Sequence, residues 1–282
     1  MLRDIVLMQK RELEQRLGER YVPRDESILT SGHDLIHVVL GPRRAGKSFF
    51  AIHALGMSGG FGYANFDDER LTDLEDLDQL VSAVDSVYEG HRTLLLDEVQ
   101  NLPRWELLVN RLQRQGYRLV VTGSNAHLLA SEFATHLTGR HLPVVLLPFS
   151  FAERLRLAGR ELTGAEQAEA LREHAGQGGF PEPLIKQVNR REYLSVLIDS
   201  ILFKDIVRRH RIRAVQGIAD LARYLFSNVA SEYSLNTLSQ VTRCKSVHTV
   251  EKYLRYLEEA FLFFSFRRFS FKVREQVRGS RK

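Results

Sequence analysis

The stretch GPRRAGKS, residues 41–48, decides the fold of this 282-residue chain. It follows the apolar run LIHVVL (residues 35–40) and precedes FFAIHAL (residues 49–55), a run with helical spacing. A strand, a loop spaced G-x-x-x-x-G-K-S and a helix are the parts of a phosphate-binding P-loop. The pattern therefore predicts that the chain binds a nucleoside triphosphate here; an ordinary glycine-containing loop between a strand and a helix is the alternative.

The residue types in this loop suit phosphate chemistry. Two glycines let the backbone turn so that successive N–H groups point at phosphate oxygens, and the first turn of the next helix adds unpaired donors. Lys47 is expected to reach the β- and γ-phosphates, and the Ser48 hydroxyl to bind Mg²⁺. The residues predicted to contact the nucleotide in this loop are Gly41, Pro42, Arg43, Arg44, Ala45, Gly46, Lys47, Ser48 and Phe49.

Five short apolar runs alternate with helical patterns in the first half of the chain. Continuous apolar runs of this kind predict a parallel sheet covered by helices on both faces, with ligands bound beyond the carboxyl ends of its strands. The predicted strands are residues 35–40, 61–66, 93–96, 118–122 and 142–147. The predicted helices are residues 4–20, 49–55, 71–89, 105–114 and 128–137, with a further helical segment near residues 25–31.

Two carboxylates follow the third predicted strand. Asp97 is expected at the end of a strand beside the P-loop strand, where it shares Mg²⁺ with Ser48. Glu98 is expected to act as the general base that activates water. Two carboxylates that simply end a strand are the alternative. After the next strand, Ser124 is predicted to sense the γ-phosphate, whereas for Asn125 an ordinary turn is equally compatible with the sequence.

Arg140 follows the helix that begins after Asn125. It is expected to act as an arginine finger on the γ-phosphate of a neighbouring subunit. A surface arginine is the alternative.

The net charge of +5 is unevenly distributed. Residues 1–200 hold 23 lysines and arginines against 28 acidic residues, whereas residues 201–282 hold 17 against 7. A net charge of +10 in the last part predicts an anionic partner, with double-stranded DNA first, although a solvated basic face is the alternative. A charged N-terminus, a single cysteine (Cys244) and the lack of a membrane-length apolar run favour a cytoplasmic protein.

The last eighty residues have helix-turn-helix spacing. Ser234 and Ser246 are predicted to cap two short helices, and the alternating aromatic residues of 261–273 suggest the β wing of a winged helix. The outward residues of the second helix would be Lys245, His248, Thr249, Lys252 and Arg255. Glu251, Glu258 and Glu259 on that helix oppose a DNA contact, so a protein-contact module is the alternative.

Several short motifs together make the chain resemble the AAA+-type P-loop ATPases of prokaryotes that carry a C-terminal domain of unknown function. These motifs are YVPR (21–24), GPRRAGKS (41–48), LDEVQ (96–100), TGSN (122–125), LTGR (137–140) and GGFPE (178–182). The resemblance implies that a lid approaches the nucleotide, with Pro181 as a base-side contact, and it strengthens the catalytic or inter-subunit interpretation of Arg140. Members of that family continue past residues 269–272 into a nuclease-like domain, which this 282-residue sequence lacks.

The resulting prediction is an α/β protein with a five-stranded parallel sheet of the AAA+ type. It comprises a P-loop ATPase domain (1–148), a helical lid (149–203) and a basic winged-helix-like domain (204–282). Mg²⁺-dependent ATP hydrolysis would serve as a switch; the lack of an Asn-Lys-x-Asp motif favours ATP over GTP. The alternatives are a nucleotide-gated DNA-binding regulator and an assembly factor that forms homo-oligomers on ATP.

Overall fold

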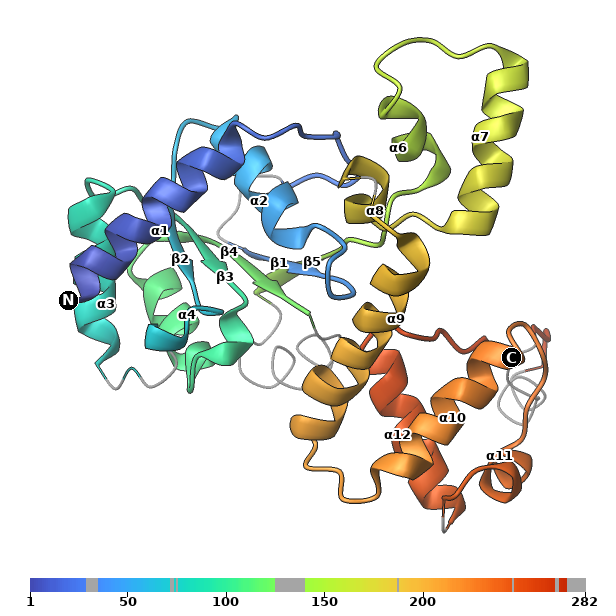
Figure 1. The fold of residues 1–282 in the computed structure, drawn as a ribbon. Coiled ribbons are helices and arrows are strands. Elements are labelled where there is room, and N and C mark those ends of the chain that lie inside the picture. Colours follow the sequence, from blue (N-terminus) through green and yellow to red (C-terminus); the bar gives the residue numbers. More distant parts are fainter. Residues whose placement is uncertain are drawn as a thin grey trace. The chain divides into compact units, whose positions relative to one another are not determined.

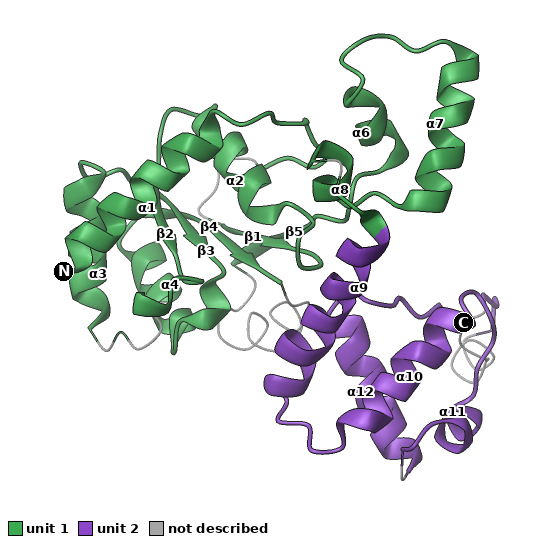
Figure 2. Cartoon of the chain, in the orientation of Figure 1, with its two compact units in different colours: residues 1–190 green, residues 191–282 purple. Residues whose placement is uncertain are grey.

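The computed structural model describes residues 1–28, 35–71, 74, 76–124, 140–186, 188–244, 246–266 and 269–272. The chain divides into two compact units, residues 1–190 and residues 191–282 (Figure 2). Each unit is described by itself below. The division into three parts at residues 148 and 203 stays a prediction.

The first unit contains the predicted five-stranded sheet (Figure 1). Its strands are β1 (Ile36–Leu40), β2 (Gly62–Asn65), β3 (Thr93–Asp97), β4 (Arg118–Gly123) and β5 (His141–Val145). Their order is β2-β3-β4-β1-β5, and every neighbouring pair is parallel. The parallel α/β fold is confirmed.

One detail of the predicted sheet is wrong. The strand that ends at Asp97, β3, does not lie beside the P-loop strand β1, because β4 pairs with both and separates them. The carboxyl ends of all three strands still meet at one edge of the sheet, so Asp97 and the P-loop remain close.

Helices flank the sheet. They are α1 (Leu2–Leu17), α2 (Lys47–Gly56), α3 (Leu77–Val87) and α4 (Trp105–Arg114). Helix α1 packs against α2, α3 and β2, and α4 packs against β4. The bounds of α4 are those predicted, because Trp105, Leu108, Val109 and Leu112 are buried and recur on one helical face.

The segment before the sheet departs from the prediction. Residues 21–28 form no helix, although a helical segment near residues 25–31 was expected; residues 29–34 lie outside the described chain. The backbone N–H of Asp25 instead donates to a carboxylate oxygen of Glu153 at 2.9 Å. The predicted helix over residues 128–137 also lies outside the described residues, as does Asn125.

The rest of the first unit is helical, with α6 (Phe151–Arg156), α7 (Gly164–Gln177) and α8 (Pro181–Lys186). Ser150 and Thr163 each close a capping box with the glutamate three residues on, which fixes where α6 and α7 begin. A short loop joins α7 to α8. Helix α7 runs to Gln177 and α8 begins at Pro181, a residue suited to a first helical position.

The second unit is also helical. Helix α9 (Arg190–Ser200) continues into a π-helical segment, η4 (Ile201–Arg208), followed by α10 (Val215–Ser227), α11 (Leu235–Val241) and α12 (Val247–Glu259). Ser234 and Ser246 cap α11 and α12 as predicted. Within the described residues after Phe261 there is no strand, so the predicted wing is not found there. Among the helices described, none is both long and apolar enough to cross a membrane.

Candidate functional site

The P-loop turns tightly between β1 and α2. Gly41 has φ +149°, and a Cβ atom on it would lie 2.0 Å from the carbonyl oxygen of Leu146, so no other residue fits. Gly46 has φ +92° and is the residue before the first turn of α2. The loop therefore brings the positive end of a helix to the carboxyl end of β1, which favours a bound anion.

Three cations come from the loop and the first turn of α2. Lys47 is buried, and its Nζ donates to the carbonyl oxygen of Pro42 at 3.0 Å, across the loop. Arg44 is exposed in a left-handed conformation (φ 64°) and forms an ion pair of 2.9 Å with Glu182 of α8. Arg43 is half-buried. Their charge makes the loop electropositive.

The Ser48 hydroxyl meets the carboxylate of Asp97. Ser48 Oγ donates to Asp97 Oδ1 at 2.7 Å, and the Tyr63 hydroxyl donates to Asp97 Oδ2 at 3.0 Å. Thr122 Oγ1 donates to Oδ1 as well. Burial raises the pKa of the Asp97 carboxyl, the charge of Glu98 raises it further, and the hydrogen bonds it accepts oppose this.

This pair of oxygens suits Mg²⁺. A hydroxyl and a carboxylate are the hard oxygen donors that Mg²⁺ prefers. Neighbouring ligands of an octahedral Mg²⁺ at about 2.1 Å lie about 3 Å apart, close to the 2.7 Å between Ser48 Oγ and Asp97 Oδ1. The two side chains thus fit the protein part of a magnesium site that phosphate oxygens and water would complete.

Glu98 is held in an unusual conformation. Its φ of 51° is left-handed, which few residues other than glycine adopt, and its side chain is half-buried. Its backbone N–H donates to Thr122 Oγ1 at 2.9 Å, and Gln100 Nε2 donates to its carboxylate at 2.5 Å. Strained conformations of this kind are frequent at functional sites.

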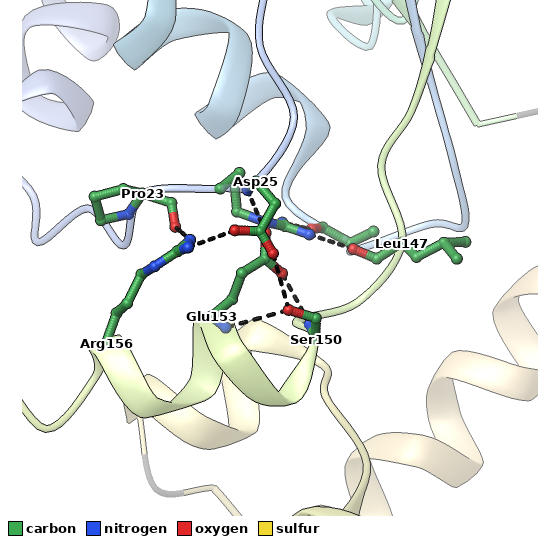
Figure 3. Close-up of polar contacts among 8 residues, drawn as sticks. Pro23, Asp25, Leu147, Ser150, Glu153 and Arg156 are labelled. Carbon is green, nitrogen blue, oxygen red and sulfur yellow. Dashed lines mark hydrogen bonds and ion pairs between the residues drawn. The ribbon is translucent and has the colours of Figure 1, made fainter. Parts of the chain in front are cut away.

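A buried ion pair between Arg24 and Glu153 is hydrogen-bonded to the P-loop. The Nε of Arg24 lies 2.8 Å from Glu153 Oε1, and both side chains are 3% exposed. The other guanidinium nitrogens donate to the carbonyl oxygens of Ala45, at 3.1 Å, and of Leu147. Figure 3 shows Glu153 at the centre of the cluster, facing Ser150 and Asp25. The Arg24 side chain thus contacts three segments: the P-loop, the segment after β5, and helix α6.

The start of α8 also lies against the P-loop. A Cβ atom on Gly46 would lie 3.9 Å from Pro181 Cγ. Gly179 is in close contact with Phe149, since its carbonyl accepts from the Phe149 N–H at 2.7 Å and a Cβ on it would lie 2.1 Å from the Phe149 oxygen. Pro181, a predicted base-side contact, is therefore within the site.

Aromatic rings border the first turn of α2. Phe49 is half-buried, its ring centroid 4.3 Å from that of His53. Tyr21 stacks on His53 at 4.4 Å. Burial raises the pKa of the Tyr21 hydroxyl. The three rings thus pack together beside the first turn of α2.

Ser124 and Arg140 lie at opposite edges of the sheet. Ser124 is buried directly after β4, at the edge that carries the P-loop. Arg140 is exposed directly before β5, and its carbonyl accepts from the N–H of Ile36, the first residue of β1. The length of β1, about 15 Å at 3.3 Å per residue, therefore separates Arg140 from the P-loop.

The structure gives roles to residues to which the sequence analysis assigned none. They are Tyr63, Gln100 and Thr122, which hold the two carboxylates, and Arg24 and Glu153, which hold the loop. Arg24, Gln100 and Thr122 had a usable signal, since they stand in the motifs YVPR, LDEVQ and TGSN. Tyr63 and Glu153 had none, because each contact joins segments far apart in the chain.

Two parts of the chain are similar to known protein families. Residues 33–155 match a family described as an AAA domain, and residues 168–282 match one described as a domain of unknown function. An uncharacterised protein of Methanocaldococcus jannaschii is 34% identical over 256 residues, which are 85% of this chain and 58% of the relative. One of Haemophilus influenzae is 30% identical over 266 residues, 88% of this chain and 66% of the relative. The chain thus spans less than two thirds of either.

A solved structure shares the fold. The Walker-type ATPase of Pyrococcus abyssi aligns with a TM-score of 0.53 over 98% of this chain and 91% of its own, at 14% sequence identity. At this identity the likeness concerns the fold.

Proposed function

We propose that the chain binds ATP with Mg²⁺ at its P-loop and hydrolyses it, since residues 33–155 match a family described as an AAA domain. The observation that carries the proposal is the 2.7 Å contact between Ser48 Oγ and Asp97 Oδ1, with Glu98 next in the chain. This contact joins α2, the helix after the P-loop, to the carboxyl end of β3, which is two strands away from β1 in the sheet.

Each residue has a defined role in this proposal. Gly41 to Gly46 present backbone N–H groups to the phosphates, and Lys47 places its ammonium against the β- and γ-phosphates. Ser48 and Asp97 hold Mg²⁺, which neutralises developing charge on the phosphate oxygens when bound. Ser124 senses whether the γ-phosphate is present. Phe49 and Pro181 border the rest of the nucleotide.

Glu98 is the proposed general base. Its carboxylate accepts a proton as water attacks the γ-phosphorus, the bond to the β–γ bridging oxygen breaks, and ADP and phosphate leave. A kinase would pass the phosphoryl group to a bound acceptor and would have less need of a carboxylate aimed at water. The strained, left-handed backbone at Glu98 supports a catalytic role, since such conformations are frequent at functional sites.

Phosphate release and nucleotide binding together test the proposal. We expect Glu98→Gln to keep ATP affinity within about twofold and to lower phosphate release at least 100-fold, the usual contribution of a general base. Lys47→Ala should lose ATP binding in calorimetry with magnesium present. Equal hydrolysis by the wild-type protein and Glu98→Gln would remove the assigned base, and no ATP binding by the wild-type protein would remove the function.

The helices after β5 are proposed as a lid. Two close contacts support this role: Pro181 lies against Gly46, and Arg44 pairs with Glu182. Closure over bound ATP would use hydrolysis as a conformational switch within residues 149–203. The winged-helix-like nature of residues 204–282 and a cytoplasmic location remain proposals as well.

A second candidate is a nucleotide-gated DNA-binding protein with little turnover. The net charge of +10 over residues 201–282 favours it. Nucleotide-dependent homo-oligomers are a further proposal, supported by the exposed Arg140 at the sheet edge opposite the P-loop.

A further inference from the structure

Five exposed cations gather within ten residues of the second unit. They are Lys204, Arg208, Arg209, Arg211 and Arg213, named here the basic ridge. None of the five forms an ion pair with any described residue. Over residues 201–213 they are opposed by one acidic residue, Asp205, so this short stretch has a net charge of +4.

Buried apolar residues of η4 anchor the basic ridge in the core of the second unit. Ile201, Leu202 and Ile206 of η4 are almost fully buried, which turns the charged side of the segment outward. At its end, the His210 ring stacks on Tyr256 of α12 with a centroid distance of 3.5 Å and an interplanar angle of 12°. The cations therefore project from a surface that is packed against α12.

Three other arginines of the same unit form ion pairs. Arg223 and Arg243 both lie within 4 Å of Asp220, at 3.7 and 3.4 Å. Arg255 of α12 pairs with Glu259 at 3.5 Å. Over residues 247–259, two cations meet three carboxylates, a net charge of −1. Among the described residues, the ridge therefore carries more unneutralised positive charge than α12, the helix that the sequence had indicated.

We propose that the basic ridge binds the phosphate backbone of double-stranded nucleic acid, without reading its sequence. Arginine-rich surfaces match phosphate oxygens bidentately. Residues 201–214 contain no asparagine or glutamine, the side chains that read adenine edges, so the segment is suited to backbone contacts.

A membrane surface fits the ridge less well. Basic amphipathic helices bind bilayers by inserting an apolar face between the lipids. The apolar face of η4 is already used in the core of the unit, by Ile201, Leu202 and Ile206. Phe203 is the one large apolar side chain of η4 that is exposed, at 47%, which is less apolar area than an inserted helix face offers, so the ridge mainly presents charge to a polyanion.

The proposal supplies the surface that the DNA-binding candidate needs, and its test is independent of ATP hydrolysis. Anisotropy of a labelled 20-base-pair duplex of mixed sequence is measured with the full chain, without nucleotide, over a series of salt concentrations. Two double variants are compared, each removing two positive charges. Arg209→Gln/Arg213→Gln alters the ridge, and Lys252→Gln/Arg255→Gln alters α12.

The ridge variant should raise the Kd for the duplex at least tenfold at 0.1 M salt. The slope of log K against log salt should become shallower by about 1.8, because each phosphate contact contributes about 0.9. The α12 variant should stay within about twofold of the wild type. Unchanged circular dichroism and melting temperature would show that both variants are folded.

Three outcomes would overturn the proposal. Equal weakening by both variants would mean diffuse attraction to the whole unit. Tighter binding of a single strand of the same length would exclude the duplex. Equal binding of anionic phospholipid vesicles would indicate a general polyanion surface. Lys47→Ala should bind duplex as the wild type does, so a failure of the ATPase proposal would be seen separately.

Discussion

Arg24 and Glu153, 129 residues apart in the chain, form a buried ion pair with an N–O distance of 2.8 Å. The carboxylate also accepts the backbone N–H groups of Asp25 and Ser150, and the guanidinium lies 4.9 Å from the Phe149 ring centroid. Both charges are therefore satisfied away from water. Through the Ala45 carbonyl the pair also fixes the loop proposed to hold phosphate.

We expect Arg24→Gln to destabilise the protein by about 3 kcal/mol, since removing one partner leaves a buried charge uncompensated. ATP affinity should fall too, because the Ala45 carbonyl loses a donor. Arg24→Lys should not restore either property, since an ammonium cannot make the same forked set of contacts. Urea denaturation and calorimetry measure the two effects.

A nearby exposed pair serves as the control. Arg156 and Asp25 form an ion pair with side chains 39% and 48% exposed. Arg156→Gln should cost at most about 1 kcal/mol and leave ATP affinity unchanged. The role assigned to Arg24 would be wrong if the two variants lost ATP affinity to the same extent.

Thr122 is expected to position both acidic residues of the site. Its hydroxyl donates to Asp97 and accepts from the N–H of Glu98, and the residue is fully buried. Thr122→Val keeps the shape but removes both bonds, so phosphate release should fall at least tenfold with a smaller change in ATP affinity. Thr122→Ser should recover most of the rate. A purely structural role predicts instead that only the melting temperature changes.

Much of the fold could be predicted because its strands are continuous apolar runs that end in polar residues. The same property placed the P-loop, Asp97 and Ser124 at one edge of the sheet. Strand order could not be read this way, since a helical crossover can return beside either neighbour. The sequence therefore put β3 next to β1, whereas β4 lies between them.

The contacts that hold the site were beyond local patterns. The helix predicted near residues 25–31 shows why. In the fold, Arg24 and Asp25 contact Glu153, which follows β5 in the chain. Contacts over such a sequence distance cannot be predicted from the residues around position 25. The conformation of Glu98 was equally hidden, since nothing in its residue type marks a positive φ.

Two glycines next to the site are expected to tolerate no side chain. A Cβ on Gly41 would lie 2.0 Å from the Leu146 oxygen, and one on Gly179 would lie 2.1 Å from the Phe149 oxygen. Since backbone atoms cannot yield locally, either change to alanine should cost at least about 3 kcal/mol. Gly176, within α7 and with open space around it, is the control. Gly176→Ala should stabilise by about 0.5–1 kcal/mol, and equal losses at all three positions in urea denaturation would contradict this.

Arg140 can serve as a catalytic arginine only for another copy of the chain, because it lies at the sheet edge opposite its own P-loop. Arg140→Ala should therefore keep ATP affinity and lower phosphate release by about 10³-fold, the lower range for arginine fingers. Arg118, exposed at the start of β4 on the same edge, is the control, and its change to alanine should leave phosphate release unchanged.

Mixing Arg140→Ala with Glu98→Gln should restore activity above that of either variant alone, since one supplies the base and the other the arginine at a shared interface. Wild-type activity per molecule that does not change with protein concentration, together with no recovery in the mixture, would leave Arg140 as a surface residue.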